Sequence, residues 1–142
     1  MGKLIKDVRA NGLPSIVPLK SLLEDAAFQE SKAALPVAVG RDTEGRPRVI
    51  DLAEAPHILM AGATKQGKTE AVHSLILSLL CSRTPEDVRF ALIDPKGYEL
   101  KAYKSLSSNY MLAASDAANE KVITTPAGAE TLLRELLSLI HI

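Results

Sequence analysis

The stretch that decides the fold is Gly62-Ala63-Thr64-Lys65-Gln66-Gly67-Lys68-Thr69. It fits G-x-x-x-x-G-K-[ST] at every fixed position, which is the pattern of a phosphate-binding loop. The apolar run 57–61 before it predicts a short buried strand. The residues after it have the i, i+3, i+4, i+7 spacing of an amphipathic helix, at Val72, Leu75, Ile76, Leu79 and Leu80. Strand, loop and helix therefore follow one another in the order that this motif requires.

The residue types in this loop suit a nucleoside triphosphate. Backbone N–H groups of such a loop converge on the phosphates, and the following helix N-terminus adds further N–H groups and a positive dipole end. Gly62 and Gly67 let the backbone bend and approach the ligand closely. Lys68 can reach the β- and γ-phosphates, and the Thr69 hydroxyl can ligate Mg²⁺. The simpler alternative is a glycine-containing strand–helix turn with a solvated lysine.

Composition places the chain among globular domains. It has 142 residues, 46% hydrophobic and 24% charged, which is enough for one domain with a core. Lys and Arg balance Asp and Glu at 17 each, so net charge gives no argument for nucleic acid. The single cysteine, Cys81, is expected to be a buried core thiol. With no apolar run near the ~20 residues of a membrane span and no signal peptide, we expect a soluble, cytoplasmic chain.

The segments before the motif predict a short helix and a hairpin. Residues 1–20 form an irregular lead-in. The capping box that begins at Ser21 predicts a helix from Ser21 to Gln29, anchored by Phe28. Residues 35–40 and 48–52 are predicted strands, and the turn residues 41–47 join them as a hairpin.

The segments after the motif predict further parallel strands and a final helix. The apolar run 88–93 suits a central parallel strand, which completes a right-handed βαβ unit. A helical turn over 97–103, strands over 110–112 and 122–123, and a surface loop over 115–121 are expected next. Pro126 near N1, after a threonine cap, then begins a helix. Its apolar stripe comprises Ala129, Leu132, Leu133, Leu136, Leu137 and Ile140.

Several strings, in their order and spacing, resemble the FtsK/SpoIIIE family of DNA translocases. They lie at 35–47, 51–52, 56–64, 75–80, 84–96 and 99–100, within a resemblance that covers 17–140 and is strongest over 35–103. It implies an α/β P-loop NTPase of RecA-like type, a partial parallel sheet with flanking helices, preceded by the short helix and hairpin. Residues 1–34 would be the lead-in segment and short helix, and 35–142 an FtsK-type P-loop motor domain, incomplete at the C-terminus.

The resemblance also implies ligands and partners. ATP and Mg²⁺ would bind at Gly62, Ala63, Thr64, Lys65, Gln66, Gly67, Lys68 and Thr69, with Thr69 on the metal. The full-length protein would form a homo-hexameric ring that pumps double-stranded DNA during chromosome segregation and cell division. An inner-membrane tether upstream stays open. The family usually has glycine where this chain has Lys65, so its loop would be stiffer and carry an extra charge.

The catalytic residues are a different matter. In the family the strand ending in Asp-Glu, the neighbouring subunit's arginine and the DNA-reading domain lie beyond the last helix. The 142-residue chain is therefore expected to lack hydrolysis on its own. By pattern, Asp94 could be the Mg²⁺-coordinating aspartate. By resemblance it ends an earlier strand, and Asp-Pro also favours a plain turn or capping role.

The remaining polar and aromatic residues give no second site. His57, at the start of a strand, suits a structural hydrogen bond. His57, His73, His141 and Cys81 do not have metal-site spacing. Tyr98 and Tyr103 are expected to pack rather than to stack on bases, and no basic–aromatic patch is visible.

Three other functions stay open at this point. The chain could be a small P-loop kinase or phosphotransferase that uses Asp94, with turnover indifferent to DNA. It could be a non-catalytic nucleotide-binding module with a defined partner. It could also be part of a conjugative or secretion ring ATPase, which would look alike over these residues.

Overall fold

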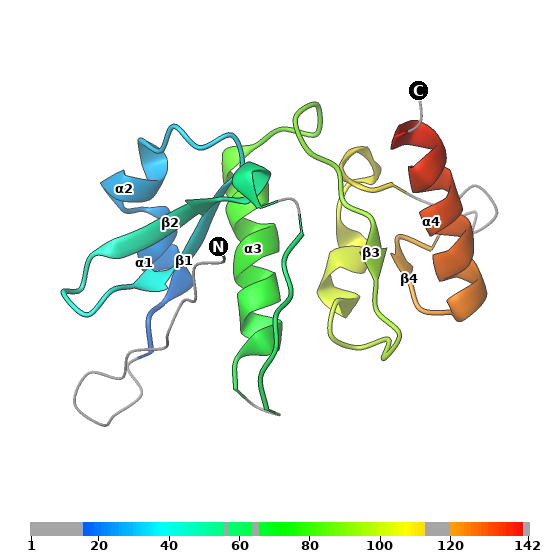
Figure 1. Cartoon of the computed structure of the whole chain (residues 1–142), viewed down its shortest axis with the longest axis horizontal. Helices are drawn as coiled ribbons and strands as arrows, with labels where there is room; N and C mark the ends of the chain where they lie inside the picture. Colours follow the sequence, from blue (N-terminus) through cyan, green and yellow to red (C-terminus); the bar gives the residue numbers. More distant parts are fainter. Residues whose placement is uncertain (1–15, 56, 64–65, 113–119, 141–142) are drawn as a thin grey trace. The chain divides into compact units, whose positions relative to one another are not determined.

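The computed structural model describes residues 16–55, 57–63, 66–112 and 120–140. The described part divides into two compact units, one ending at Arg83 and the other beginning at Thr84. Each unit is a small mixture of helices and strands (Figure 1). Of the predicted irregular lead-in over 1–20, residues 1–15 lie outside the described residues, and the last two, Leu19 and Lys20, begin a helix instead. Most of the predicted loop over 115–121, and Thr64, Lys65 and His141, also lie outside the described residues.

The first unit contains a hairpin and one long helix. Its elements are α1 (Leu19–Leu23), α2 (Ala26–Gln29), β1 (Pro36–Arg41), β2 (Pro47–Asp51), the 3₁₀ turn η1 (Leu52–Glu54) and α3 (Lys68–Ser82). The predicted hairpin and the predicted helix after the glycine-rich loop are confirmed. The elements α1 and α2 replace the single helix that the capping box predicted.

The capping-box prediction was wrong because two other residues begin the helices. Pro18 is the N-cap of α1, and Ser21 lies inside that helix with its hydroxyl donating to the Pro18 carbonyl at 2.8 Å. Asp25 caps α2 by accepting the Ala27 N–H at 3.1 Å. A carboxylate that satisfies a free N–H restarts the helix one turn later. Phe28 is buried, as predicted.

Local side-chain contacts hold the hairpin. The antiparallel register pairs Val37 with Ile50 and shifts between Ala38 and Gly40, which is a β-bulge. In the turn, Asp42 accepts the N–H groups of Glu44 and Arg46 at 3.0 and 2.9 Å. These contacts satisfy turn amides that would otherwise face only water.

The α3 helix docks on β1 through serines. The Ser74 hydroxyl donates to the Ala38 carbonyl at 2.6 Å, and the Ala38 N–H donates to the Ser78 hydroxyl at 3.1 Å. Both groups of Ala38 are thus paired by side chains of α3. Ala38 also lies in the core with Leu22 and Phe28. The helix that follows the glycine-rich loop is therefore fixed on the hairpin.

The second unit is built on a two-stranded parallel sheet. Its elements are β3 (Leu92–Ile93), the 3₁₀ turns η2 (Lys101–Ser105) and η3 (Ser108–Tyr110), β4 (Val122–Ile123) and α4 (Pro126–Ile140). Leu92 pairs with Val122 and Ile93 with Ile123. The predicted strand over 88–93 is thus shorter, and the one over 110–112 is reduced to a bridge at Met111.

The α4 helix begins as the sequence predicts. Pro126 is its first residue, and the Thr125 hydroxyl accepts the Gly128 N–H at 3.2 Å. The predicted apolar stripe is confirmed only in part. Ala129, Leu132 and Leu136 pack with Ile123, whereas Leu133 and Leu137 are 51% and 54% exposed.

The predicted buried strand over 57–61 was wrong. These residues are exposed and extended, and Leu59 is 93% exposed. An apolar run becomes a buried strand only when neighbouring strands pair with it, and no strand of the first unit's described residues does so. The predicted βαβ unit is therefore not formed there. None of the helices in the described part is long and apolar enough to cross a lipid bilayer.

Candidate functional site

The glycine-rich loop leads directly into α3. In Figure 1 the chain runs past α3 to the N-terminal end of that helix and then enters it. Gly67 is the N-cap residue, in the left-handed region at φ 86°. A side chain at Gly67 would meet open space, so the backbone conformation, not crowding, favours glycine here. No side chain among the described residues caps α3.

The Lys68 ammonium lies over the start of the loop. Its Nζ donates to the carbonyl oxygens of Gly62 and Ala63, the second at 2.9 Å. A Cβ at Gly62 would be 3.7 Å from Lys68 Cγ, so the lysine stem packs on this glycine. These two partners are neutral carbonyls, and the Lys68 charge has no acidic partner among the described residues, so the ammonium can turn towards an anion. Thr69 follows in the first turn of α3, half-buried.

These residues fit a polyphosphate with Mg²⁺. The first N–H groups of an α-helix have no acceptor within the helix, and α3 is 15 residues long with no cap from a described side chain at its N-terminus. Lys68 supplies a positive charge and Thr69 a hydroxyl oxygen, which is a ligand type that Mg²⁺ takes. Glu70, in the same first turn, is exposed and opposes this charge. Gln66 and Gly67 connect the loop to the helix.

Asp94 has a different environment. It is only 4% exposed, and its two carboxylate oxygens accept the N–H groups of Lys96 and Leu100 at 3.1 and 3.0 Å. The Leu100 N–H, followed by weaker contributions from other N–H groups of the loop, holds the pKa of Asp94 below its ordinary value, although desolvation opposes this. The carboxylate organises the loop 94–100. This geometry supports the capping interpretation over a metal ligand.

Other residues singled out in the sequence are distributed as follows. His57 lies exposed in the extended segment, and Tyr103 is buried as predicted. Cys81 is exposed near the C-terminal end of α3, so the prediction of a core thiol was wrong. Tyr98 is 68% exposed, so its predicted packing role was wrong as well. The described residues contain no group of three possible metal ligands.

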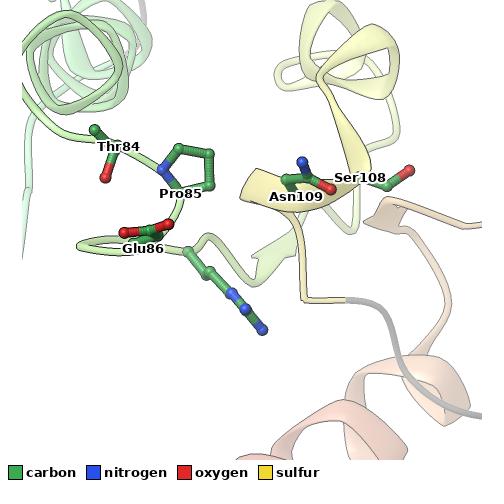
Figure 2. Close-up of a pocket in the computed structure, with 6 residues that line it drawn as sticks. Thr84, Pro85, Glu86, Ser108 and Asn109 are labelled. Carbon is green, nitrogen blue, oxygen red and sulfur yellow. The ribbon is translucent and has the colours of Figure 1, made fainter.

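Sequence reasoning missed a hollow in the second unit. Figure 2 shows it between two segments of that unit, and its volume is about 640 Å³. It is lined by Thr84, Pro85, Glu86, Arg89, Ser108 and Asn109. The Thr84 hydroxyl is engaged with Asp87 at 2.8 Å. Nothing in the sequence connects residues 84–89 with residues 108–109.

A comparison with protein families decides the relationship. The model of the FtsK/SpoIIIE family matches residues 18–141. The chain belongs to the FtsK/SpoIIIE family. The predicted resemblance is thereby confirmed, and the kinase alternative is not favoured.

Individual members of the FtsK/SpoIIIE family are also similar. A DNA translocase FtsK of Haemophilus influenzae is 48% identical over 91 residues, 64% of this chain and 17% of that protein. One of Chlorobaculum tepidum is 38% identical over 124 residues, 87% of this chain and 15% of that protein. The chain thus spans less than a fifth of the length of these relatives.

Proposed function

We propose that this chain is the ATP-binding part of a DNA translocase that pumps double-stranded DNA during chromosome segregation and cell division. One observation carries the proposal: the G-x-x-x-x-G-K-[ST] loop enters α3 at an N-terminus that no described side chain caps, with the Lys68 ammonium beside the loop. Membership of the FtsK/SpoIIIE family supports the same function. Relatives that carry the name DNA translocase FtsK support the choice of DNA.

The loop residues have separate roles in this proposal. The backbone of Gly62, Ala63, Thr64, Lys65, Gln66 and Gly67 surrounds the phosphates. Lys68 leaves the loop carbonyls and offsets phosphate charge, and the Thr69 hydroxyl holds Mg²⁺. ATP, when bound with Mg²⁺, supplies the phosphoanhydride bond whose hydrolysis drives movement. The contacts of Ser74 and Ser78 with Ala38 fix α3, whose N-terminus follows the loop, on β1.

The fold and the assembly of the whole protein are part of the proposal. We infer a RecA-like motor domain from residue 35 onward, and the family match over residues 18–141 supports it. The exposed apolar side chains Ile58, Leu59 and Met60 are surface that further parts of such a domain would cover. A homo-hexameric ring around DNA is the assembly that the family suggests.

The test is calorimetric titration of the chain with Mg·ATP. Lys68→Ala removes a charge-assisted contact worth ~1.5–3 kcal/mol, which corresponds to about a ten- to hundredfold loss of affinity. Lys20→Ala is the matched control, because Lys20 is an exposed lysine that pairs with Glu24 at 3.7 Å. Equal affinity in wild type and Lys68→Ala would refute the proposal.

A further inference from the structure

The second unit carries an exposed group of cationic and aromatic side chains. Lys96, Tyr98, Lys101 and Lys104 are all exposed, and we call them the lysine–tyrosine surface. Residues 95–105 contain these three lysines and a single acidic residue, Glu99. The zero net charge of the chain hides this local excess of positive charge. The sequence showed no basic–aromatic patch because Tyr98 was expected to be buried.

The backbone under the lysine–tyrosine surface is fixed from below. Buried Asp94 accepts the N–H groups of Lys96 and Leu100, both in the loop 94–100. Tyr103 is only 6% exposed, and its N–H donates to the Leu100 carbonyl at 3.0 Å. A surface that is already ordered loses less conformational entropy when a partner binds.

The lysine–tyrosine surface consists of two groups, adjacent in sequence, whose members lie close to one another. Lys101 and Lys104 belong to the 3₁₀ turn η2, and three residues per turn put i and i+3 on one face. The Lys96 ammonium lies 6.0 Å from the centroid of the Tyr98 ring. Lys96 also contacts Glu99 at 2.5 Å, but this pair is exposed, and exposed pairs are worth little.

We propose that the lysine–tyrosine surface binds the sugar–phosphate backbone of duplex DNA. Lysine ammonium groups and tyrosine hydroxyls are common ligands of backbone phosphates, and such contacts position a protein without reading sequence. One exposed ring among three lysines favours backbone contact over a stacking platform, which uses several aromatic side chains. The inference rests on the proposed function for its choice of DNA and assigns that partner to named residues.

The experiment measures binding of the full chain to a fluorescein-labelled duplex by anisotropy, between ~50 and ~200 mM salt. The test variant is Lys96→Ala/Lys101→Ala/Lys104→Ala. The matched control, Lys20→Ala/Lys32→Ala/Arg134→Ala, removes the same charge from exposed residues elsewhere. Tyr98→Ala and a labelled single strand separate backbone contact from base stacking, and circular dichroism verifies that every variant is folded.

We expect weak wild-type binding, with a dissociation constant of ~10⁻⁴–10⁻⁶ M. The test variant should lose about tenfold in affinity and two to three units of the salt slope, roughly one for each lysine, whereas the control should lose little. Equal losses in test and control variants would overturn the inference. The inference would also be overturned if a single strand bound more tightly than the duplex and Tyr98→Ala caused the largest loss of affinity among the variants.

Failure of this inference can be told apart from failure of the proposed function. If the wild-type chain does not bind the duplex but still binds Mg·ATP through Lys68, the lysine–tyrosine surface is refuted and the nucleotide site stands. If the duplex binds through the three lysines but Lys68→Ala leaves the ATP affinity unchanged, the nucleotide site is refuted and the lysine–tyrosine surface stands.

Discussion

Two loops of this chain treat their backbone N–H groups in opposite ways. The loop 62–69 leads into α3 through the left-handed Gly67, and no described side chain caps the helix that follows. The loop 94–100 also contains a left-handed glycine, Gly97 at φ 75°, but a buried carboxylate of its own, Asp94, accepts its N–H groups. In the first loop the Gln66 N–H donates to the Ala63 carbonyl at 3.3 Å, but the N-terminus of α3 has no described side-chain cap, whereas the second loop directs its donors to its own carboxylate.

The difference shows how an anion site can be recognised. A glycine-rich turn with free N–H groups and a nearby cation needs an anion from outside. The same kind of turn with an internal carboxylate is already satisfied and acts as a support. The loop 94–100 supports exposed lysines in this way. The predictions below test each side of this comparison.

The largest effect on stability is expected in the loop 94–100, whose N–H groups are bound by Asp94. Asp94→Ala removes the acceptor of two N–H groups in a residue that is 4% exposed, and should lower the free energy of unfolding by about 2–3 kcal/mol. Urea denaturation measures this, and exposed Glu86→Ala is the control. A loss below about 0.5 kcal/mol would mean that the loop does not depend on its carboxylate.

A smaller effect on stability is expected in the loop 62–69. Gly67→Ala places a side chain at φ 86°, which costs about 1–2 kcal/mol, and should also weaken binding of Mg·ATP. Gly62→Ala is the control for stability, because its Cβ would make only ordinary contacts, at 3.7 Å from Lys68 Cγ. If both alanine variants were equally stable, the left-handed geometry of Gly67 would not matter.

The two loops should also differ in their response to acid. The pKa of Asp94 is lower in the folded state than in the unfolded chain, so its stabilisation is complete above the ordinary aspartate value and disappears as pH falls through the folded pKa. Stability should therefore decline from about pH 5 downward, and Asp94→Asn should flatten this decline. The pKa of Asp51 is lowered as well, chiefly by the Leu35 N–H, so Asp51→Asn is measured in parallel. An unchanged acid profile in Asp94→Asn would contradict this account.

The smallest effect is expected on turnover. The sequence contains no Asp-Glu dipeptide, and the Asp94 carboxylate is occupied by N–H groups. We expect the isolated chain to release no phosphate above background, with or without duplex DNA. Phosphate release that is abolished by both Lys68→Ala and Asp94→Ala would restore Asp94 as a catalytic metal ligand.

Features that depend on neighbouring residues could be predicted from the sequence. Pro126 after Thr125 begins α4, and the turn between β1 and β2 forms where its polar residues and glycine indicate. The glycine-rich loop and α3 also follow from their local pattern. These features need only side chains a few positions away, and the sequence displays those directly.

Features that depend on distant partners were missed. The run 57–61 would need neighbouring strands to become a buried strand. Serines of α3 bind Ala38, and apolar spacing gives no sign of those contacts. Tyr98 is exposed because Asp94 and Tyr103 fix the loop beneath it. Hydrophobic periodicity cannot identify such contacts, because they join residues that are far apart or polar.

The most direct test is residue-resolved. Amide ¹H–¹⁵N shifts of the full chain are followed while Mg·ATP is added. The account predicts that signals of residues 66–70 move in wild type and stay in place in Lys68→Ala, while signals of residues 96–100 do not move in either protein. Shifts confined to 96–100, or shifts at 66–70 that persist in Lys68→Ala, would contradict the assignment of the open loop as the anion site.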